Sequence, residues 1–232
     1  MRTVLLANNR LGWQVGGYLA ERGDLVGVVL HPDDRRSFGD ELAALDAPSW
    51  TWPDGRDEAA DLEPECLLSV LFGFKVPPDW LGIPSWRALN LHPGLLPWNG
   101  GANPNVWPLV DGSPAGTTLH VMAEEIDAGD VLCQEPVEVR PDDTAETLYR
   151  RLEEASFELL RSVWPTVRDL EPTPQAGEGS YHRTSELASL DPTGDDLAVV
   201  DRLRARTFPP HGAEFERDGH RYRITVDIEP LD

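Results

Sequence analysis

Short apolar runs alternate with amphipathic segments through the first third of the chain. Residues 3–7 and 25–30 are almost continuous runs of apolar side chains, as in strands that are buried on both faces. Residues 11–22, between them, place apolar side chains at helical spacing, and residues 66–72 form a further apolar run. Because strands that alternate with helices build parallel sheets, the pattern predicts an α/β fold with a Rossmann-like, mostly parallel sheet.

The same periodicities extend over the rest of the chain. They predict further strands at 50–52, 87–92, 117–122 and 131–139, and further helices at 38–45, 103–110 and 143–169. Asn103 and Pro104 have the residue types of a helix cap and a first helical position, and Thr144 is a second expected cap. The inward side of the longest helix is expected to hold Leu148, Leu152, Phe157, Leu160 and Val163.

A change of composition marks the end of this pattern. Between the longest helix and residue 180 the chain becomes rich in Pro, Thr, Gly and Gln, which is typical of a linker. We therefore predict a main domain at 1–170, a linker at 171–180 and a small subdomain at 181–232. The subdomain is expected to contain a C-terminal helix and a β-hairpin that turns at Asp218 and Gly219.

Polar side chains gather where one predicted strand ends. The two-residue period of a strand puts Asn90 and His92 on the same face, and Pro93 ends the strand beside them. Asp127 follows in the turn between two later strands, which can bring its carboxylate over that end. Carboxyl ends of strands in open α/β sheets are where ligands bind, so an amide, an imidazole and a carboxylate can form one site here. By itself, an Asn two residues before a His is more often a structural pair than a catalytic one.

Composition narrows the functional classes. The 232 residues carry a net charge of −21 with a single lysine, Lys75, so the sequence lacks the clustered cations that a nucleic-acid surface needs. This acidity fits either an ordinary solvated surface or a high-salt cytoplasm. No apolar run is long enough to span a bilayer and no secretory signal follows Met1, which indicates a cytoplasmic protein.

Cysteine and histidine usage gives no sign of a metal. Cys66 and Cys133 lie in apolar strand-like runs, as expected of buried, reduced thiols. The six histidines show no metal-ligand spacing, and no metal is expected. The first loop, residues 8–12, lacks the glycine pattern that cradles a dinucleotide phosphate.

Three separated motifs give the chain a family resemblance. They read Asn90-Leu91-His92-Pro93-Gly94-Leu95-Leu96-Pro97, then Thr118-Leu119-His120, then Ile126-Asp127-Ala128-Gly129-Asp130. Together they resemble the formyltransferases that use 10-formyltetrahydrofolate as formyl donor. The stretches 103–108 and 111–120, with 180–183 and 204–210 later, are similar to the branch that formylates nucleotide-linked amino sugars.

The resemblance implies a role for each site residue. Asn90, His92 and Asp127 would be catalytic: the amide stabilises an oxyanion, the imidazole takes the amine proton and the carboxylate orients the imidazole. The folate would meet backbone groups at Leu67, Ser69, Leu71, Phe72 and Asp130. The acceptor, a nucleotide-linked amino deoxy sugar with dTDP as the expected carrier, would be bound by Lys75, Trp98, Asn99, Asn103 and Trp107. Lys75 equally fits an exposed solvating lysine, and Trp107 a core residue.

One departure and several alternatives stay open. Where the family usually has an arginine after Leu-Leu-Pro, this chain has Gly100. The acceptor is alternatively an amino-acid-derived amine, or water in a hydrolase of formyltetrahydrofolate. The acidity and the short tail argue against methionyl-tRNA as acceptor, residues 8–12 argue against glycinamide ribonucleotide, and the intact catalytic motifs argue against a folate-binding protein without activity. The tail serves either as a dimerisation element, giving a homodimer, or in acceptor binding.

Overall fold

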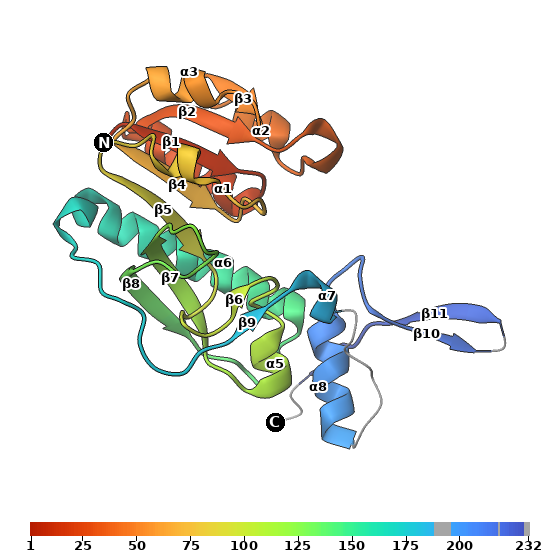
Figure 1. Cartoon of the computed structure of the whole chain (residues 1–232). Helices are drawn as coiled ribbons and strands as arrows, with labels where there is room; N and C mark the ends of the chain where they lie inside the picture. The colour runs from red at the N-terminus through yellow and green to blue at the C-terminus, as the bar shows by residue number, and fades with distance from the viewer. Residues whose placement is uncertain (188–195, 218, 230–232) are drawn as a thin grey trace. The chain divides into compact units, whose positions relative to one another are not determined.

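The computed structural model describes residues 1–187, 196–217 and 219–229. Its main sheet has seven strands in the order β3-β2-β1-β4-β5-β7-β8 (Figure 1). From β3 to β5 each neighbouring pair is parallel, whereas β7 pairs antiparallel with β5, which confirms the predicted mostly parallel sheet. The strands are β1 (Thr3–Ala7), β2 (Leu25–Leu30), β3 (Ser49–Thr51), β4 (Cys66–Val70), β5 (Arg87–His92), β7 (Ala115–Val121) and β8 (Val131–Val137).

Helices and two small sheets complete the described part of the chain. The helices are α1 (Arg10–Glu21), α2 (Gly39–Ala43), α3 (Arg56–Asp61), α4 (Pro78–Leu81), α5 (Trp107–Asp111), α6 (Ala145–Val163), α7 (Thr184–Leu187) and α8 (Asp196–Arg206), with 3₁₀ turns at Asp33–Arg35 and Trp164–Asp169. β6 (Gly100–Gly101) pairs with β9 (Tyr181–His182), and β10 (Ala213–Arg217) pairs with β11 (His220–Ile224). The C-terminal helix and the two strands of the hairpin are therefore present as predicted, whereas the predicted turn residue Asp218 lies outside the described residues.

The predicted start of the helix at 103–110 is wrong. Asn103 has a φ of 55°, whereas a capping residue is extended, and α5 begins only at Trp107. Pro108, not Pro104, is the proline of its first turn. The left-handed tolerance of asparagine, rather than its capping ability, explains the residue at 103.

The longest helix is capped as predicted and ends earlier than predicted. Thr144 accepts the backbone N–H of Thr147 on its Oγ1 at 3.3 Å. α6 ends at Val163 because Pro165 has no N–H for the α-helical ladder, and the chain continues as a 3₁₀ turn.

Contacts divide the chain into two compact units, each made of three segments. Unit 1 consists of residues 1–92, 118–134 and 156–175, and unit 2 of residues 93–117, 135–155 and 176–232. The linear division into a main domain, a linker at 171–180 and a subdomain stays a prediction.

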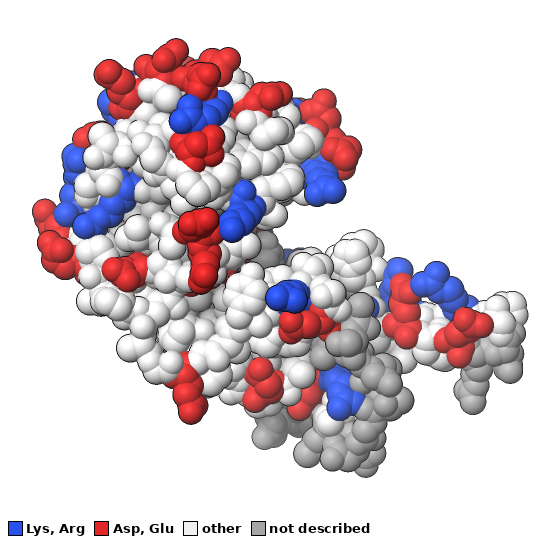
Figure 2. Space-filling view, in the orientation of Figure 1, with Lys and Arg blue, Asp and Glu red and all other residues white. Residues whose placement is uncertain are grey.

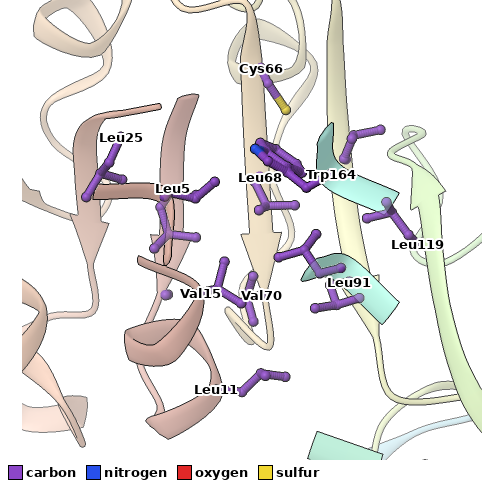
Figure 3. Close-up of a cluster of buried hydrophobic side chains, with 14 of the residues drawn as sticks. Leu5, Leu11, Val15, Leu25, Cys66, Leu68, Val70, Leu91, Leu119 and Trp164 are labelled. Carbon is purple, nitrogen blue, oxygen red and sulfur yellow. The ribbon is translucent and has the colours of Figure 1, made fainter. Parts of the chain in front are cut away.

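The core of unit 1 lies on both faces of its strands. In β1, Leu5 belongs to one buried cluster and Val4 and Leu6 to another, because successive side chains point to opposite faces. Figure 3 shows the first cluster, where side chains of the strands meet Val15 of α1 and Trp164. Burying one such leucine stabilises the fold by about 1.5–3 kcal/mol, and this positions the strand ends that carry the site.

Unit 2 has its own smaller core. Leu109 of α5, Leu148 and Leu152 of α6, and Ala205 of α8 are buried together in one cluster. Leu148 and Leu152 lie one turn apart, so they share the inward stripe that the sequence predicted for this helix.

Charges of both signs are mixed on the face that Figure 2 shows. Acidic side chains are spread over that face, and basic side chains lie among them. Within the described residues, no helix is long and apolar enough to cross a membrane.

Candidate active site

The end of β5 carries two polar side chains on one face. Asn90 pairs in the sheet with Ser69 of β4 and His120 of β7, and His92 pairs with Thr118. The His92 side chain is 6% exposed, which is unusual for a titratable group unless it has partners. β5 therefore places an amide and an imidazole next to each other, as the two-residue period predicted.

Asp127 completes the group from the turn between β7 and β8. One carboxylate oxygen, Oδ2, lies 3.5 Å from Nδ1 of His92, and the other, Oδ1, accepts from Nδ2 of Asn90 at 3.2 Å. The Asp127 side chain is 7% exposed. The three side chains predicted from the motifs are thus brought together, although Asp127 lies 37 residues after Asn90 in the sequence.

His120 is a fourth member of this group, to which the sequence assigned no role. Its Nδ1 donates to the carbonyl oxygen of Val121 at 2.9 Å, so Nε2 is free to accept from Nδ2 of Asn90 at 3.1 Å. The same Nε2 lies 3.5 Å from Oδ1 of Asp127. The signal in the sequence is the histidine of the Thr118-Leu119-His120 motif, but its relevance depends on the register between β5 and β7.

The hydrogen bonds assign each group a chemical capacity. Both contacts of the Asn90 amide nitrogen are to the site itself, one to His120 and one to Asp127. His92 has a carboxylate oxygen 3.5 Å from its Nδ1, which orients the ring. The arrangement can take a proton from a substrate at His92 and offer an amide hydrogen to a developing negative charge.

No metal centre is formed by the described residues. Among them, no group of three or more His, Cys, Asp or Glu side chains is arranged to hold an ion. Cys66 and Cys133 are free. Burial raises the pKa of the Cys66 thiol, and burial raises the pKa of Cys133 to about 11, so neither is a ready nucleophile near neutral pH.

The candidate folate-binding residues of unit 1 lie in β4, directly after β4 and directly before β8. Leu67 and Ser69 are buried in β4, and Phe72 is buried just beyond it. Leu71, between them, is half-buried with a φ of 49°, a left-handed conformation. Asp130 is exposed, and its carbonyl oxygen accepts from the backbone N–H of Val121 at 2.8 Å.

A side chain outside this set holds the end of β4. Nδ2 of Asn9 donates to the carbonyl oxygens of Val70 and Leu71, at 3.2 and 3.1 Å, and its Oδ1 accepts the backbone N–H of Gly12 in the first turn of α1. The first loop lacks a phosphate-binding glycine pattern. Its Asn9 fixes the backbone at the end of β4, the strand next to β5.

The candidate acceptor residues are divided between the units. Lys75 is exposed in unit 1, five residues beyond the end of β4. Trp98, Asn99, Asn103 and Trp107 belong to unit 2. Trp98 and Asn103 are half-buried there.

Two of these residues lie in the interior of unit 2. Asn99 is fully buried, with Nδ2 donating to the carbonyl oxygen of Pro114 at 3.0 Å and Oδ1 accepting from Ser113 at 3.1 Å. Trp107 is 6% exposed and stacks on His182, with ring centroids 3.9 Å apart. Both side chains therefore stabilise the local fold of unit 2.

Gly100, where the resemblance leads one to expect an arginine, is followed by a second glycine. At Gly101, φ is 84° and a Cβ would lie 2.3 Å from the carbonyl oxygen of His182, so only glycine fits. At Gly100 a Cβ would be 3.4 Å from the ring of Tyr181, an ordinary contact. The departure at 100 is thus not forced by the space around its Cβ.

Comparison with known proteins places these features in context. A family model described as Formyl transferase matches residues 28–164, and one described as N-formyltransferase dimerization C-terminal domain matches residues 190–230. The chain is 30% identical over 207 residues to methionyl-tRNA formyltransferase of Myxococcus xanthus, which is 81% of this chain and 66% of that protein. It therefore spans just under two thirds of that protein's length. It is 29% identical over 218 residues to GDP-perosamine N-formyltransferase of Brucella melitensis, covering 88% of this chain and 84% of that protein.

Solved structures show the same fold. A sugar N-formyltransferase from Shewanella sp. FDAARGOS_354 has a TM-score of 0.86 at 23% identity, over 100% of this chain and 99% of that one. The formyltransferase PseJ from Anoxybacillus kamchatkensis was solved in complex with UDP-4,6-dideoxy-4-formamido-L-AltNAc and tetrahydrofolate. It is 29% identical with a TM-score of 0.56, over 70% of this chain and 88% of that chain.

Proposed function

The chain belongs to the formyl transferase family, whose model matches residues 28–164, and we propose that it transfers a formyl group from 10-formyltetrahydrofolate to the amino group of a nucleotide-linked amino deoxy sugar. One observation carries this proposal: Asn90, His92 and Asp127 converge at the carboxyl end of β5. The resemblance carried by the three motifs at 90–97, 118–120 and 126–130 agrees with the family match.

Each side chain has a task in the reaction. The acceptor amine attacks the formyl carbon, the new C–N bond forms, and the carbonyl oxygen becomes negatively charged. His92 takes a proton from the attacking nitrogen. The oxyanion then reforms the C=O bond as the bond from the formyl carbon to N10 breaks, and His92 returns its proton to N10, which gives the formamide and tetrahydrofolate. Asn90 donates to the oxyanion, an interaction that is stronger in the transition state and worth about 3 kcal/mol in comparable sites.

Asp127 links these two tasks. As His92 gains its proton, the Asp127 carboxylate faces a full positive charge 3.5 Å away and is drawn towards it. This weakens the bond from Asn90 Nδ2 to Asp127 Oδ1, which is 3.2 Å long before reaction. An amide hydrogen of Asn90 then becomes available when the oxyanion develops.

The position of the residues after β4 supports folate as the formyl donor. Leu71 and Phe72 directly follow β4, the neighbour of β5, at the edge where ligands of open α/β sheets bind. Leu67, Ser69 and Asp130 are proposed to take part through the backbone. PseJ, which is 29% identical to this chain, was solved with tetrahydrofolate, and this supports a folate donor here.

A sugar acceptor is supported by the relatives and by the charge of the chain. The Brucella protein, matched over 84% of its length, is described as acting on GDP-perosamine, and PseJ was solved with a UDP-linked sugar. A net charge of −21 disfavours tRNA, although the Myxococcus relative is a methionyl-tRNA enzyme. We propose dTDP as carrier, with the exposed Lys75 ammonium meeting the diphosphate. Trp98 and Asn103 of unit 2 remain candidates for the sugar or base.

The test is a panel of acceptors with formyl donor in excess. Amino deoxy sugars linked to dTDP, UDP and GDP, and separately methionyl-tRNA, are incubated with the protein, and both tetrahydrofolate release and a gain of one formyl mass are measured. Formylation of a dTDP-linked sugar is expected. Formylation of a UDP- or GDP-linked sugar alone would correct the carrier, and formylation of methionyl-tRNA alone would overturn the sugar proposal.

Controls separate catalysis from binding and from folding. Asn90→Ala and His92→Ala should each abolish most turnover while the thermal unfolding temperature changes little. Tetrahydrofolate release without any formylated acceptor would indicate hydrolysis of the donor. Release at an unchanged rate in both variants would remove the catalytic assignment.

A further inference from the structure

The turn between β7 and β8 buries one side chain while its neighbours face solvent. Glu124, Glu125, Ile126 and Ala128 are exposed, whereas the Asp127 side chain is 7% exposed. Asp127 has a φ of 57°, a conformation that residues with a Cβ rarely adopt. Such a turn needs a contact from elsewhere to hold it.

That contact comes from Gln175, 48 residues along the chain. Its Nε2 donates to the carbonyl oxygen of Asp127 at 2.7 Å and to that of Gly129 at 2.8 Å, which uses both amide hydrogens. The Gln175 side chain is half-buried, so these bonds are partly shielded from water. One of these carbonyls belongs to Asp127 itself and the other to Gly129, two residues later. The two bonds therefore fix the backbone that sets the direction of the Asp127 carboxylate.

The segment that carries Gln175 is itself fixed to the sheet. Thr173 exchanges two backbone hydrogen bonds with Val131, the first residue of β8, at 2.8 and 2.9 Å. At Gly129 a Cβ would lie 1.8 Å from the carbonyl oxygen of Val121, so only glycine fits at this position. The turn is therefore bonded by Gln175 and, at the carbonyl oxygen of Asp130, by the backbone N–H of Val121 at 2.8 Å.

We propose that Gln175 is a positioning residue for formyl transfer: it fixes the backbone of Asp127 so that the carboxylate faces His92 and Asn90. The inference rests on the proposed function, because that function gives Asp127 its role. Without the amide, the turn can relax from its left-handed conformation, and the carboxylate loses its contacts with His92 Nδ1 and Asn90 Nδ2 together.

The first test is a kinetic cycle between Gln175 and Asp127. Gln175→Ala should lower kcat about 10- to 100-fold, as is usual when a partner that orients a functional ligand is removed. The KM for the folate should stay within about 3-fold, because the lost interaction belongs to the transition state. In an Asp127→Asn background the same change should alter kcat by less than about 2-fold, since residues that act as a unit are not additive.

Matched variants guard this cycle against a merely structural effect. Gln175→Glu keeps the size but points an acceptor at two carbonyl oxygens, and should behave like Gln175→Ala. Glu178→Gln, an exposed change in the same segment, should leave kcat unchanged. An unchanged kcat in Gln175→Ala, or an equal loss with and without the Asp127 carboxylate, would overturn the proposal.

Crystal structures of the wild-type protein and of Gln175→Ala provide a readout that needs no activity. A carboxylate of Asp127 that has moved away from His92 Nδ1 in the variant supports the positioning role, and one that stays within 3.5 Å overturns it. If the wild-type protein transfers no formyl group to any acceptor, the proposed function fails, and this structural comparison still decides the role of Gln175.

Discussion

At the scale of single residues, the site depends on one carboxylate with several partners. Asp127 contacts Asn90, His92 and His120 through its two oxygens. Asp127→Asn keeps the size of the side chain and removes its charge, so the protein should fold while kcat falls roughly 10²- to 10⁴-fold. Steady-state kinetics with the best acceptor of the panel measures this. Glu125→Gln on the same turn is the control, and an equal loss there would attribute the effect to general electrostatics.

The paired glycines of β6 give a second test at this scale. A Cβ on Gly101 would collide with the backbone of β9, whereas one on Gly100 makes an ordinary contact. Gly101→Ala should lower the free energy of unfolding by about 1–3 kcal/mol through strain at positive φ. Gly100→Ala should change it by less than about 0.5 kcal/mol. Urea unfolding of both variants measures the difference, and equal effects would contradict the proposed steric cause.

At the scale of elements, a buried carboxylate joins the start of β2 to the turn after α6. Asp24 is 10% exposed at its side chain, accepts from Arg22 Nε at 2.9 Å and accepts from Trp164 Nε1 at 3.1 Å. Burial alone raises the pKa of Asp24, but hydrogen bonds from the Met1 amino group, Arg22 and Trp164 outweigh it and lower that pKa.

The lowered pKa fixes the sign of a pH effect. The folded state prefers the ionised carboxylate, so its contribution to stability is complete above the ordinary carboxyl pKa of about 3.9 and is lost as pH falls through the lower folded value. Asp24→Asn should therefore reduce the free energy of unfolding by about 1–3 kcal/mol at pH 7. The difference between wild type and variant, measured by urea unfolding, should be constant from about pH 5 to 8 and shrink below about pH 4. A difference that persists undiminished in acid would refute the role of the charge.

The elements that the sequence predicted well are those with the simplest local causes. β1, β2 and β5 coincide with continuous or alternating apolar runs, and Thr144 caps α6 as its residue type suggests. The predicted start of α5 was wrong because asparagine either caps a helix or adopts a left-handed backbone conformation. Only the φ angle of Asn103 shows that the second applies here. The predicted end of α6 was wrong because the apolar pattern continues past Pro165, whereas the α-helical hydrogen bonds stop before it.

At the scale of the whole molecule, the C-terminal hairpin suggests an assembly. Residues 190–230 match a dimerisation domain, and on the hairpin Phe215 and Tyr222 are stacked 5.0 Å apart while 39% and 45% exposed. Large exposed aromatics of this kind are typical of interfaces, so we propose a homodimer that buries them. The double variant Phe215→Glu and Tyr222→Glu should sediment as a monomer.

Analytical ultracentrifugation over a range of concentrations measures the assembly directly. Trp13→Glu, which changes an exposed aromatic of unit 1, is the matched control and should leave the dimer intact. A wild-type protein that is monomeric at all concentrations, or a double variant that remains dimeric, would exclude the hairpin as the contact.

The sequence by itself determined the class of fold, the strand that carries Asn90 and His92, and the family motifs, because period, cap chemistry and motif wording are local properties of the chain. Only the tertiary structure decided that His120 lies against Asn90, since that depends on the register of two antiparallel strands. It likewise decided that Gln175 holds the Asp127 turn, and that Asn99 and Trp107 are interior residues of unit 2. Contacts between segments far apart in sequence follow from strand order and packing, and no local pattern encodes them.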